Sequence, residues 1–315
     1  MSKIAIVGSG LVGRAWAITF ARAGHEVVLW DSQPDAPAKA IDYIARILPD
    51  LVAHDLLNGA SEDELLARIR GASGLDDALA GAVHVQENTS EDVGVKRDVF
   101  ARLDAAAEPT AVLASSTSAI LPSAFTETLK GRARCLVVHP INPPYLIPAV
   151  EVVPSPWTDP AVVERTAAFM RAAGQSPIVM KREIDCFVMN RMQGALLEEA
   201  FRLVAEGYAS VEDIDIGLRE GLALRWSFIG PFETIELNAP GGVRDYAERY
   251  QQMYERIFPT VQWRADWAGP VMDTIEAERR KLLPADRLQE RQAWRDRRLM
   301  ALAAHKKRAE KDFGR

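Results

Sequence analysis

The chain has 315 residues, of which 48% are hydrophobic and 26% charged, so it is long enough for two domains and excludes collagen-like, coiled-coil and disordered proteins. A net charge of −6 argues against a nucleic-acid partner. The sequence contains no run of about 18 apolar residues, so we expect no membrane span. Two cysteines, Cys135 and Cys186, are too few for a disulfide framework or a zinc site, so we expect no bound metal. No secretion signal is evident either, and we therefore expect a cytoplasmic protein.

The first half of the chain alternates short apolar runs with helical stretches. We expect a helix at 11–23 and a longer helical stretch at 36–69, broken near Pro49 and Gly59. Strands separated by helices indicate an α/β fold of the Rossmann type, a doubly wound parallel sheet with helices on both faces. The predicted strands are 4–7, 26–30, 82–86, 111–114, 135–138, 149–153 and 177–180.

The pattern changes after about residue 182. An amphipathic helix is predicted at 187–206, ended by Gly207, and no convincing strand follows it. We therefore expect a first domain of residues 1–184 and an all-α domain of residues 185–315. Residues 281–315 carry 11 Lys and Arg against 5 Asp and Glu, which we interpret as the solvated face of a last helix.

A glycine-rich turn follows the first predicted strand. Gly8, Gly10 and Gly13, with Leu11 and Val12 between them, form the pattern G-x-G-x-x-G between a strand and a helix. The first glycine permits a tight turn, the second lets the backbone approach a pyrophosphate, and the third lets the helix pack closely on the strand. The free amides at the helix start favour bound phosphate, so a dinucleotide site is predicted.

Asp31 ends the next predicted strand, where its carboxylate can bind an adenosine ribose hydroxyl. A phosphate on that hydroxyl would lie about 4 Å away and cost about 4 kcal/mol at an effective dielectric near 20. Ser32, Gln33 and Pro34 offer no arginine to offset this cost. We expect NAD rather than NADP.

Three further polar residues accompany strands of the same sheet. His139 and Ser118 follow predicted strands, at the sheet edge where doubly wound folds place their chemistry. Glu151 lies within an apolar strand, where a lone carboxylate is unfavourable unless it is paired, and His139 is the expected partner. Each residue also has a structural interpretation, as a core histidine, a turn former or a strand-edge charge. Their coincidence beside a dinucleotide site favours catalysis.

With these motifs the chain resembles the 3-hydroxyacyl-CoA dehydrogenase family, in particular its lambda-crystallin and L-gulonate 3-dehydrogenase branch. The resemblance runs from Ile4 to about Asn238. Its most specific segments are 114–118, 139–151, 188–191 and 221–231.

The resemblance implies roles for individual residues. Glu91 and Lys96 fall on the family's second cofactor segment, and Asn142 falls near the nicotinamide. The helical half is implied to form a homodimer. The catalytic positions are implied to be Ser118, His139, Glu151 and Asn190.

These residue types suit the oxidation of a secondary alcohol. A neutral imidazole near pH 7 can remove the hydroxyl proton, so His139 is expected to be the general base. Glu151 would hold its other ring nitrogen, while Ser118 and Asn190 would bind the reacting oxygen.

The substrate is less narrowly defined. Lys39 and Arg46 are outnumbered by acids between residues 32 and 66, which is unfavourable for the three phosphates of CoA. Arg225, beside Trp226, can instead bind a small carboxylate in a two-point contact, and the alternative interpretation is a structural salt bridge or stacking on the indole. We expect a free 3-hydroxy acid, such as L-gulonate or 3-hydroxybutyrate.

Several alternatives remain open. Within the enzyme class they are a short-chain L-3-hydroxyacyl-CoA and L-carnitine, for which Trp226 or Tyr145 would supply part of an aromatic cage. Outside it, the protein would be a crystallin-like structural protein that binds a dinucleotide. Dimerisation through the helical half would use some of its large apolar residues, which are Phe201, Phe228, Phe232, Trp263, Trp267, Leu282, Leu283 and Trp294.

Overall fold

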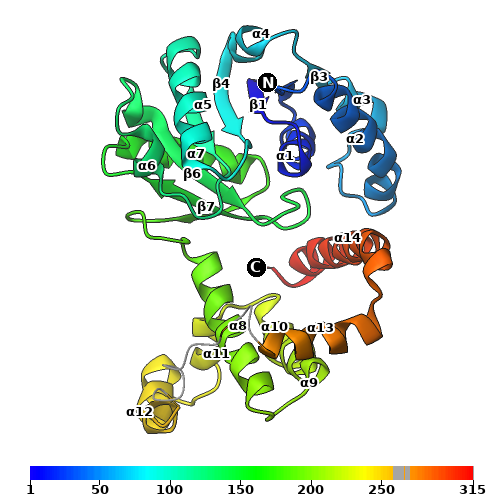
Figure 1. Ribbon diagram of the computed structural model, residues 1–315, viewed down its shortest axis with the longest axis vertical. Helices are drawn as coiled ribbons and strands as arrows, with labels where there is room; N and C mark the ends of the chain where they lie inside the picture. Colours follow the sequence, from blue (N-terminus) through cyan, green and yellow to red (C-terminus); the bar gives the residue numbers. More distant parts are fainter. Residues whose placement is uncertain (258–265, 267–269, 315) are drawn as a thin grey trace. The chain divides into compact units, whose positions relative to one another are not determined.

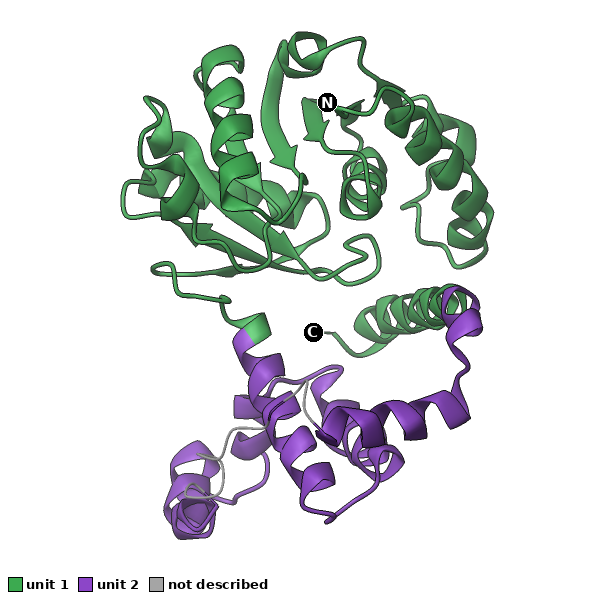
Figure 2. Ribbon diagram, in the orientation of Figure 1, with its two compact units in different colours: residues 1–190, 292–315 green, residues 191–291 purple. Residues whose placement is uncertain are grey.

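The computed structural model describes residues 1–257, 266 and 270–314 (Figure 1). Its internal contacts divide the chain into two units (Figure 2). The first comprises Met1–Asn190 together with Gln292–Arg315, and the second comprises Arg191–Arg291. Trp263 and Trp267 lie outside the described residues. No described helix is both long and apolar enough to cross a membrane.

One eight-stranded sheet forms the centre of the first unit, with the order β3-β2-β1-β4-β5-β6-β7-β8. The reversal of strand order beside β1 is the feature of a doubly wound fold, and it creates a crevice at the carboxyl ends of β1 and β4. The Rossmann-type prediction is therefore confirmed. The strands are β1 (Lys3–Val7), β2 (Glu26–Trp30), β3 (Ile69–Gly71), β4 (Ala82–Glu87), β5 (Val112–Ser115), β6 (Cys135–Pro140), β7 (Ala149–Pro154) and β8 (Ser176–Val179).

The sheet is not parallel throughout, which corrects the expectation from the sequence. β6 and β7 pair antiparallel, whereas every other neighbouring pair is parallel. Residues 141–148 connect β6 to β7, and a parallel crossover needs about a dozen residues or more. The chain therefore turns back on itself at this point.

Helices cover both faces of the sheet (Figure 1). One core cluster packs α1, α2, α3 and α7 against one face, and a second packs α4, α5 and α6 against the other. Strands buried on both faces explain the continuous apolar runs of the sequence. The helices are α1 (Leu11–Arg22), α2 (Ala36–Ala53), α3 (Glu62–Leu66), α4 (Leu75–Leu79), α5 (Val93–Ala106), α6 (Pro122–Thr126) and α7 (Pro160–Ala172).

Two local expectations within residues 36–69 were wrong. α2 continues through Pro49, because burial of the flanking Leu48 and Leu51 in the core offsets the hydrogen bond that a proline removes. The end of the stretch is not helical, since Ile69 begins β3 and pairs with Val27. A three-residue edge strand is too short to show an alternating pattern.

The second unit is helical in its described part. α8 leads into it from the first unit and ends before Gly207, which has a φ of +72°. The helices are α8 (Met189–Ala205), α9 (Val211–Ile216), a π-helical turn (Gly217–Leu222), α10 (Ala223–Trp226), α11 (Pro231–Glu236), α12 (Gly242–Glu255) and α13 (Pro270–Leu282).

The last helix, α14 (Leu288–Phe313), returns to the first unit (Figure 2). Met300 is 2% exposed and packs in the same core cluster as α1 and α2. Lys307 pairs with Asp55 at 2.7 Å. The basic segment at the end of the chain is thus a docked helix.

Candidate active site

The glycine-rich turn joins β1 to α1. Gly8 has a φ of +90°, which favours glycine, and its amide donates to the carbonyl of Trp30 at 2.8 Å. A Cβ at Gly13 would lie 1.9 Å from the carbonyl oxygen of Gly8, whereas a Cβ at Gly10 would meet nothing within 4 Å. The close helix packing and the open space beside the helix start both fit a bound pyrophosphate.

Asp31 lies at the end of β2 beside this turn. Its Oδ2 accepts from the amide of Ser9 at 2.8 Å, and its Oδ1 accepts from the amide of Gln33 at 3.0 Å. Leu11, the first residue of α1, is 57% exposed, whereas Val12 is half-buried against the core. The carboxylate is therefore held at the turn, where the ribose of a dinucleotide binds in this fold.

His139 and Glu151 form a buried pair on β6 and β7. They are direct partners in the antiparallel register, and Nδ1 of His139 lies 2.7 Å from Oε2 of Glu151. Glu151 is fully buried, and His139 is 5% exposed. Because an ionised carboxylate only accepts hydrogen bonds, Nδ1 carries the donated proton in this pair and Nε2 remains free to accept one.

The start of α8 converges on this pair. The amides of Val188 and Met189 donate to Oε1 of Glu151 at 2.6 and 2.9 Å. Asn190 in the first turn donates from Nδ2 to the carbonyl oxygen of Ser118 at 2.7 Å. The structure thus brings Ser118, His139, Glu151 and Asn190 together in the first unit.

Glu91 holds the loop that carries Ser118. Its Oε1 accepts from the hydroxyl of Thr117 at 2.5 Å and from the amides of Ser118 and Ala119 at 2.9 and 3.1 Å. Residue Ser118 is exposed. Glu91 therefore fixes the backbone of Ser118 from the neighbouring strand end.

Lys96 lies in α5 and is 1% exposed. Its Nζ lies 3.1 Å from both carboxylate oxygens of Glu87, which is fully buried at the end of β4. Ser115 also donates to Glu87, at 2.5 Å. Glu87 was not predicted from the sequence, because its strand also carries His84 and Gln86 and does not read as an apolar run with one carboxylate.

A buried polar network lies beside these groups and was also not predicted. Burial lowers the pKa of His84 to about 4, so the imidazole is neutral, and its Nε2 lies 2.9 Å from Oε1 of Gln86. Gln86 in turn donates to the hydroxyl of Ser116 at 2.7 Å and to the carbonyl oxygen of Val138 at 3.2 Å. Ser116 then donates to Asn88 at 2.7 Å. The network links the ends of β4 and β5 to the residue before His139.

Asn142 lies just beyond β6. Its Oδ1 is buried and has no hydrogen-bond partner within the described structure. A buried amide oxygen normally has a donor, and the carboxamide group of a nicotinamide can supply one. This oxygen, the open space at Gly10 and the acid at residue 31 together fit NAD.

Arg225 and Trp226, the predicted substrate residues, belong to α10 of the second unit. Arg225 is exposed and Trp226 is half-buried. A guanidinium that is open to solvent can bind a carboxylate.

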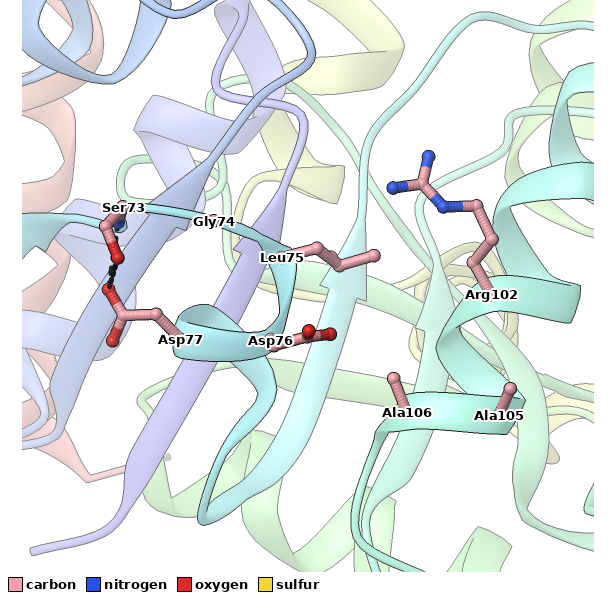
Figure 3. Close-up of a pocket in the computed structure, with 8 residues that line it drawn as sticks. All are labelled: Ser73, Gly74, Leu75, Asp76, Asp77, Arg102, Ala105 and Ala106. Carbon is pink, nitrogen blue, oxygen red and sulfur yellow. Dashed lines mark hydrogen bonds between the residues drawn. The ribbon is translucent and has the colours of Figure 1, made fainter.

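A separate hollow of about 550 Å³ lies between α4 and the end of α5 (Figure 3). It is lined by Ser73, Gly74, Leu75, Asp76, Asp77, Arg102, Ala105 and Ala106. None of the predicted site residues is among them.

The chain matches two family models. The NAD-binding domain of 3-hydroxyacyl-CoA dehydrogenase matches residues 3–184, and the C-terminal domain of the same family matches residues 187–268.

Individual proteins show the same likeness. Lambda-crystallin of Oryctolagus cuniculus is 42% identical over 307 residues, which cover 96% of this chain and 96% of that protein. L-carnitine dehydrogenase of Streptomyces griseus is 41% identical over 249 residues, covering 79% of this chain and 73% of that protein. A solved 5-formyl-3-hydroxy-2-methylpyridine 4-carboxylic acid 5-dehydrogenase, an NAD⁺-dependent dismutase, is 26% identical with a TM-score of 0.80, covering 98% of this chain and 99% of that one.

The matched models account for both halves of the chain, and the glycine turn, Asp31 and Asn142 fit the cofactor that the first model names. The chain belongs to the 3-hydroxyacyl-CoA dehydrogenase family and is an NAD-dependent dehydrogenase that acts on a CH–OH group.

Proposed function

We propose that the protein oxidises the 3-hydroxyl of a small free hydroxy acid to the 3-oxo acid, with His139 as general base and Glu151 as its orienting partner. The observation that supports this most is the buried contact of 2.7 Å between Nδ1 of His139 and Oε2 of Glu151. The substrate would resemble L-gulonate or 3-hydroxybutyrate.

In this mechanism each residue has one task. Glu151 holds the proton on Nδ1 of His139, so Nε2 accepts the proton of the substrate hydroxyl. Glu151 remains ionised and stabilises the imidazolium that results. Bound NAD supplies the acceptor for the hydride that leaves the carbinol carbon.

Ser118 and Asn190 would position the reacting oxygen. The Ser118 backbone is fixed by Glu91 and by Asn190, which leaves the hydroxyl as the adjustable group. A hydrogen bond from Ser118 or Asn190 to the substrate oxygen would favour the alkoxide character that develops as the proton leaves.

A free acid is favoured over a thioester by two observations. The relative from Streptomyces griseus is named for L-carnitine, which is itself a free 3-hydroxy carboxylate. Arg225 is exposed and offers a bidentate donor for such a group. A short-chain L-3-hydroxyacyl-CoA remains the second candidate because the matched family is named for it.

The test is NAD reduction by four substrates at equal concentration: L-gulonate, DL-3-hydroxybutyrate, L-carnitine and 3-hydroxybutyryl-CoA. We expect the highest kcat/KM with a free acid, and an Arg225→Leu variant should raise the KM for that acid with little change in kcat. Activity with the thioester alone would contradict the proposal.

We also propose that the protein forms a homodimer and that the second unit supplies the interface. Four of its large side chains are more than two-thirds exposed: Tyr208, Phe228, Phe232 and Leu237. Exposed apolar groups at this density are typical of subunit interfaces. Light scattering at micromolar concentration should give about twice the mass of one chain, and a monomer would refute the interface.

A further inference from the structure

Four consecutive residues, two just before α8 and two in its first turn, each contact the proposed catalytic groups. Phe187 packs its ring against the imidazole of His139, with centroids 5.6 Å apart and planes inclined by 52°. The amides of Val188 and Met189 bind Glu151, and Asn190 binds Ser118. One short segment therefore touches three of the groups assigned to the reaction.

The backbone is strained where this segment begins. Cys186 and Phe187 have φ angles of +62° and +53°, a region that residues other than glycine rarely adopt. Two such residues in succession persist only where the surrounding structure holds them, and strain of this kind concentrates at functional sites. Here the amide of Phe187 is tied to the carbonyl of Ile184 at 3.0 Å.

The left-handed turn has a specific geometric result. It buries the Phe187 side chain completely, in the core cluster that contains Phe100 and Phe125. The next two amides then point at Oε1 of Glu151, so both oxygens of this carboxylate are engaged, one by the helix start and the other by His139. A carboxylate held at both oxygens cannot rotate without losing one set of hydrogen bonds.

We propose that the Cys186–Phe187 turn is a positioning device for the catalytic pair and that Phe187 is its positioning residue. The ring of Phe187 limits the orientation of the imidazole and excludes water from one side of it, while the turn aims the α8 amides at Glu151. This proposal rests on the proposed role of His139 as base.

The variants Phe187→Ala and Phe125→Ala form a matched pair. Both remove a buried phenyl from one cluster, but only Phe187 touches His139. We expect Phe187→Ala to lower kcat at least tenfold with the KM for NAD within twofold, because a misplaced base slows the chemical step. Water beside the imidazole favours its charged form, so the acid limb of the kcat–pH profile should move to higher pH. Phe125→Ala should leave this limb in place.

The turn is tested by Cys186→Gly and Cys186→Val. Glycine accepts a positive φ, so this variant should keep kcat within twofold. Valine is strongly disfavoured there, and it should reproduce both the lower kcat and the shifted acid limb of Phe187→Ala. If the alanine variants do not fold, Phe187→Leu and Phe125→Leu replace them.

A second readout does not require turnover. Long-range proton–nitrogen NMR of ¹⁵N-histidine protein should show the His139 ring with its proton on Nδ1 in the wild type. In Phe187→Ala the ring can tilt away from Oε2 of Glu151, which weakens the hydrogen bond that fixes this proton, so we expect a mixture of tautomers. The NMR measurement distinguishes the positioning role of Phe187 from the proposed function. A wild type that oxidises none of the four substrates would refute the function, but it would leave the NMR result unchanged. An unchanged tautomer and acid limb in Phe187→Ala, or equal shifts in Phe125→Ala, would overturn the positioning role.

Discussion

Nδ1 of His139 lies 2.7 Å from Oε2 of Glu151 because the two residues face each other across an antiparallel strand pair, β6 and β7. They are twelve positions apart in the chain, and the short connection between the strands makes them direct neighbours. The orientation of the proposed general base is thus a property of sheet topology, which holds backbone positions more firmly than a loop does.

Replacing His139 by Gln should lower kcat by about 10²- to 10⁴-fold, because the base for the hydroxyl proton is lost. The dissociation constant for NAD, measured by fluorescence titration, should stay within threefold, since the glycine turn is untouched. In the wild type, oxidation should slow as the pH falls and the imidazole becomes protonated. Full turnover in the variant, or a flat profile between pH 6 and 9, would exclude His139 as the base.

Replacing Glu151 by Gln separates its two roles, which are to orient the imidazole of His139 and to accept hydrogen bonds from the amides of Val188 and Met189. A glutamine oxygen can still accept from the amides of Val188 and Met189, but it no longer offers a charge to the imidazole. We expect kcat to fall by about 10²- to 10⁴-fold, as when the orienting acid of a triad is neutralised, with a nearly unchanged Tm. Glu151→Leu should in addition lower the free energy of unfolding by about 0.5–2 kcal/mol, since the helix start loses its acceptor. Equal Tm values for the two variants would contradict the capping role.

Asp31 should decide the choice between NAD and NADP. In Asp31→Ser the repulsion of a 2′-phosphate disappears, so the ratio of kcat/KM for NAD to that for NADP should fall by about tenfold or more. Asp35→Ser is the control, because Asp35 is exposed and pairs with Lys39. A wild type that used NADP as efficiently as NAD would show that the carboxylate is not the discriminating group.

His84 should make the first unit less stable in acid. Its pKa is lowered by burial to about 4, whereas a histidine in the unfolded chain titrates near pH 6.5. Below pH 6.5 the unfolded state therefore binds a proton that the folded state does not, and stability declines until about pH 4. The loss amounts to about 3 kcal/mol at 1.36 kcal/mol per pH unit.

The measurement is urea unfolding at pH 7.5 and 4.5. The decline between these pH values should be smaller in His84→Gln, which keeps a donor for Gln86 and does not titrate. His305→Gln, at an exposed position, should decline as much as the wild type. An equal decline in His84→Gln would show that other groups dominate.

Met300 tests whether α14 is part of the first unit. The side chain is 2% exposed in the main core cluster, so Met300→Ala should cost about 2–5 kcal/mol of unfolding free energy. Leu302, which is 44% exposed on the same helix, is the control, and Leu302→Ala should change stability by less than about 1 kcal/mol. A Met300→Ala protein as stable as the control would mean that α14 does not dock in solution.

Much of the fold follows from short-range patterns. The Rossmann-type sheet, the NAD cofactor and the family were predicted from the G-x-G-x-x-G turn, Asp31 and the strand-end residues, and the comparisons and structure confirm them. These features could be predicted because a glycine at a tight turn and an apolar run in a buried strand depend on neighbours within a few residues. The pairing of His139 with Glu151 was also expected, because a lone buried carboxylate needs a partner.

The tertiary structure decided what depends on residues far apart in the chain. The sequence alone predicted Ser118, His139, Glu151 and Asn190 as site residues, but the reversal at β7 determined that Glu151 faces His139. Likewise, only the folded chain pairs Lys96 with the buried Glu87 and docks α14 beside α2. The physical reason is that local sequence shows only that a helix has an apolar face to bury or that a buried charge requires a partner. Which core or which opposite charge it contacts depends on the direction of each strand and the path of each connection.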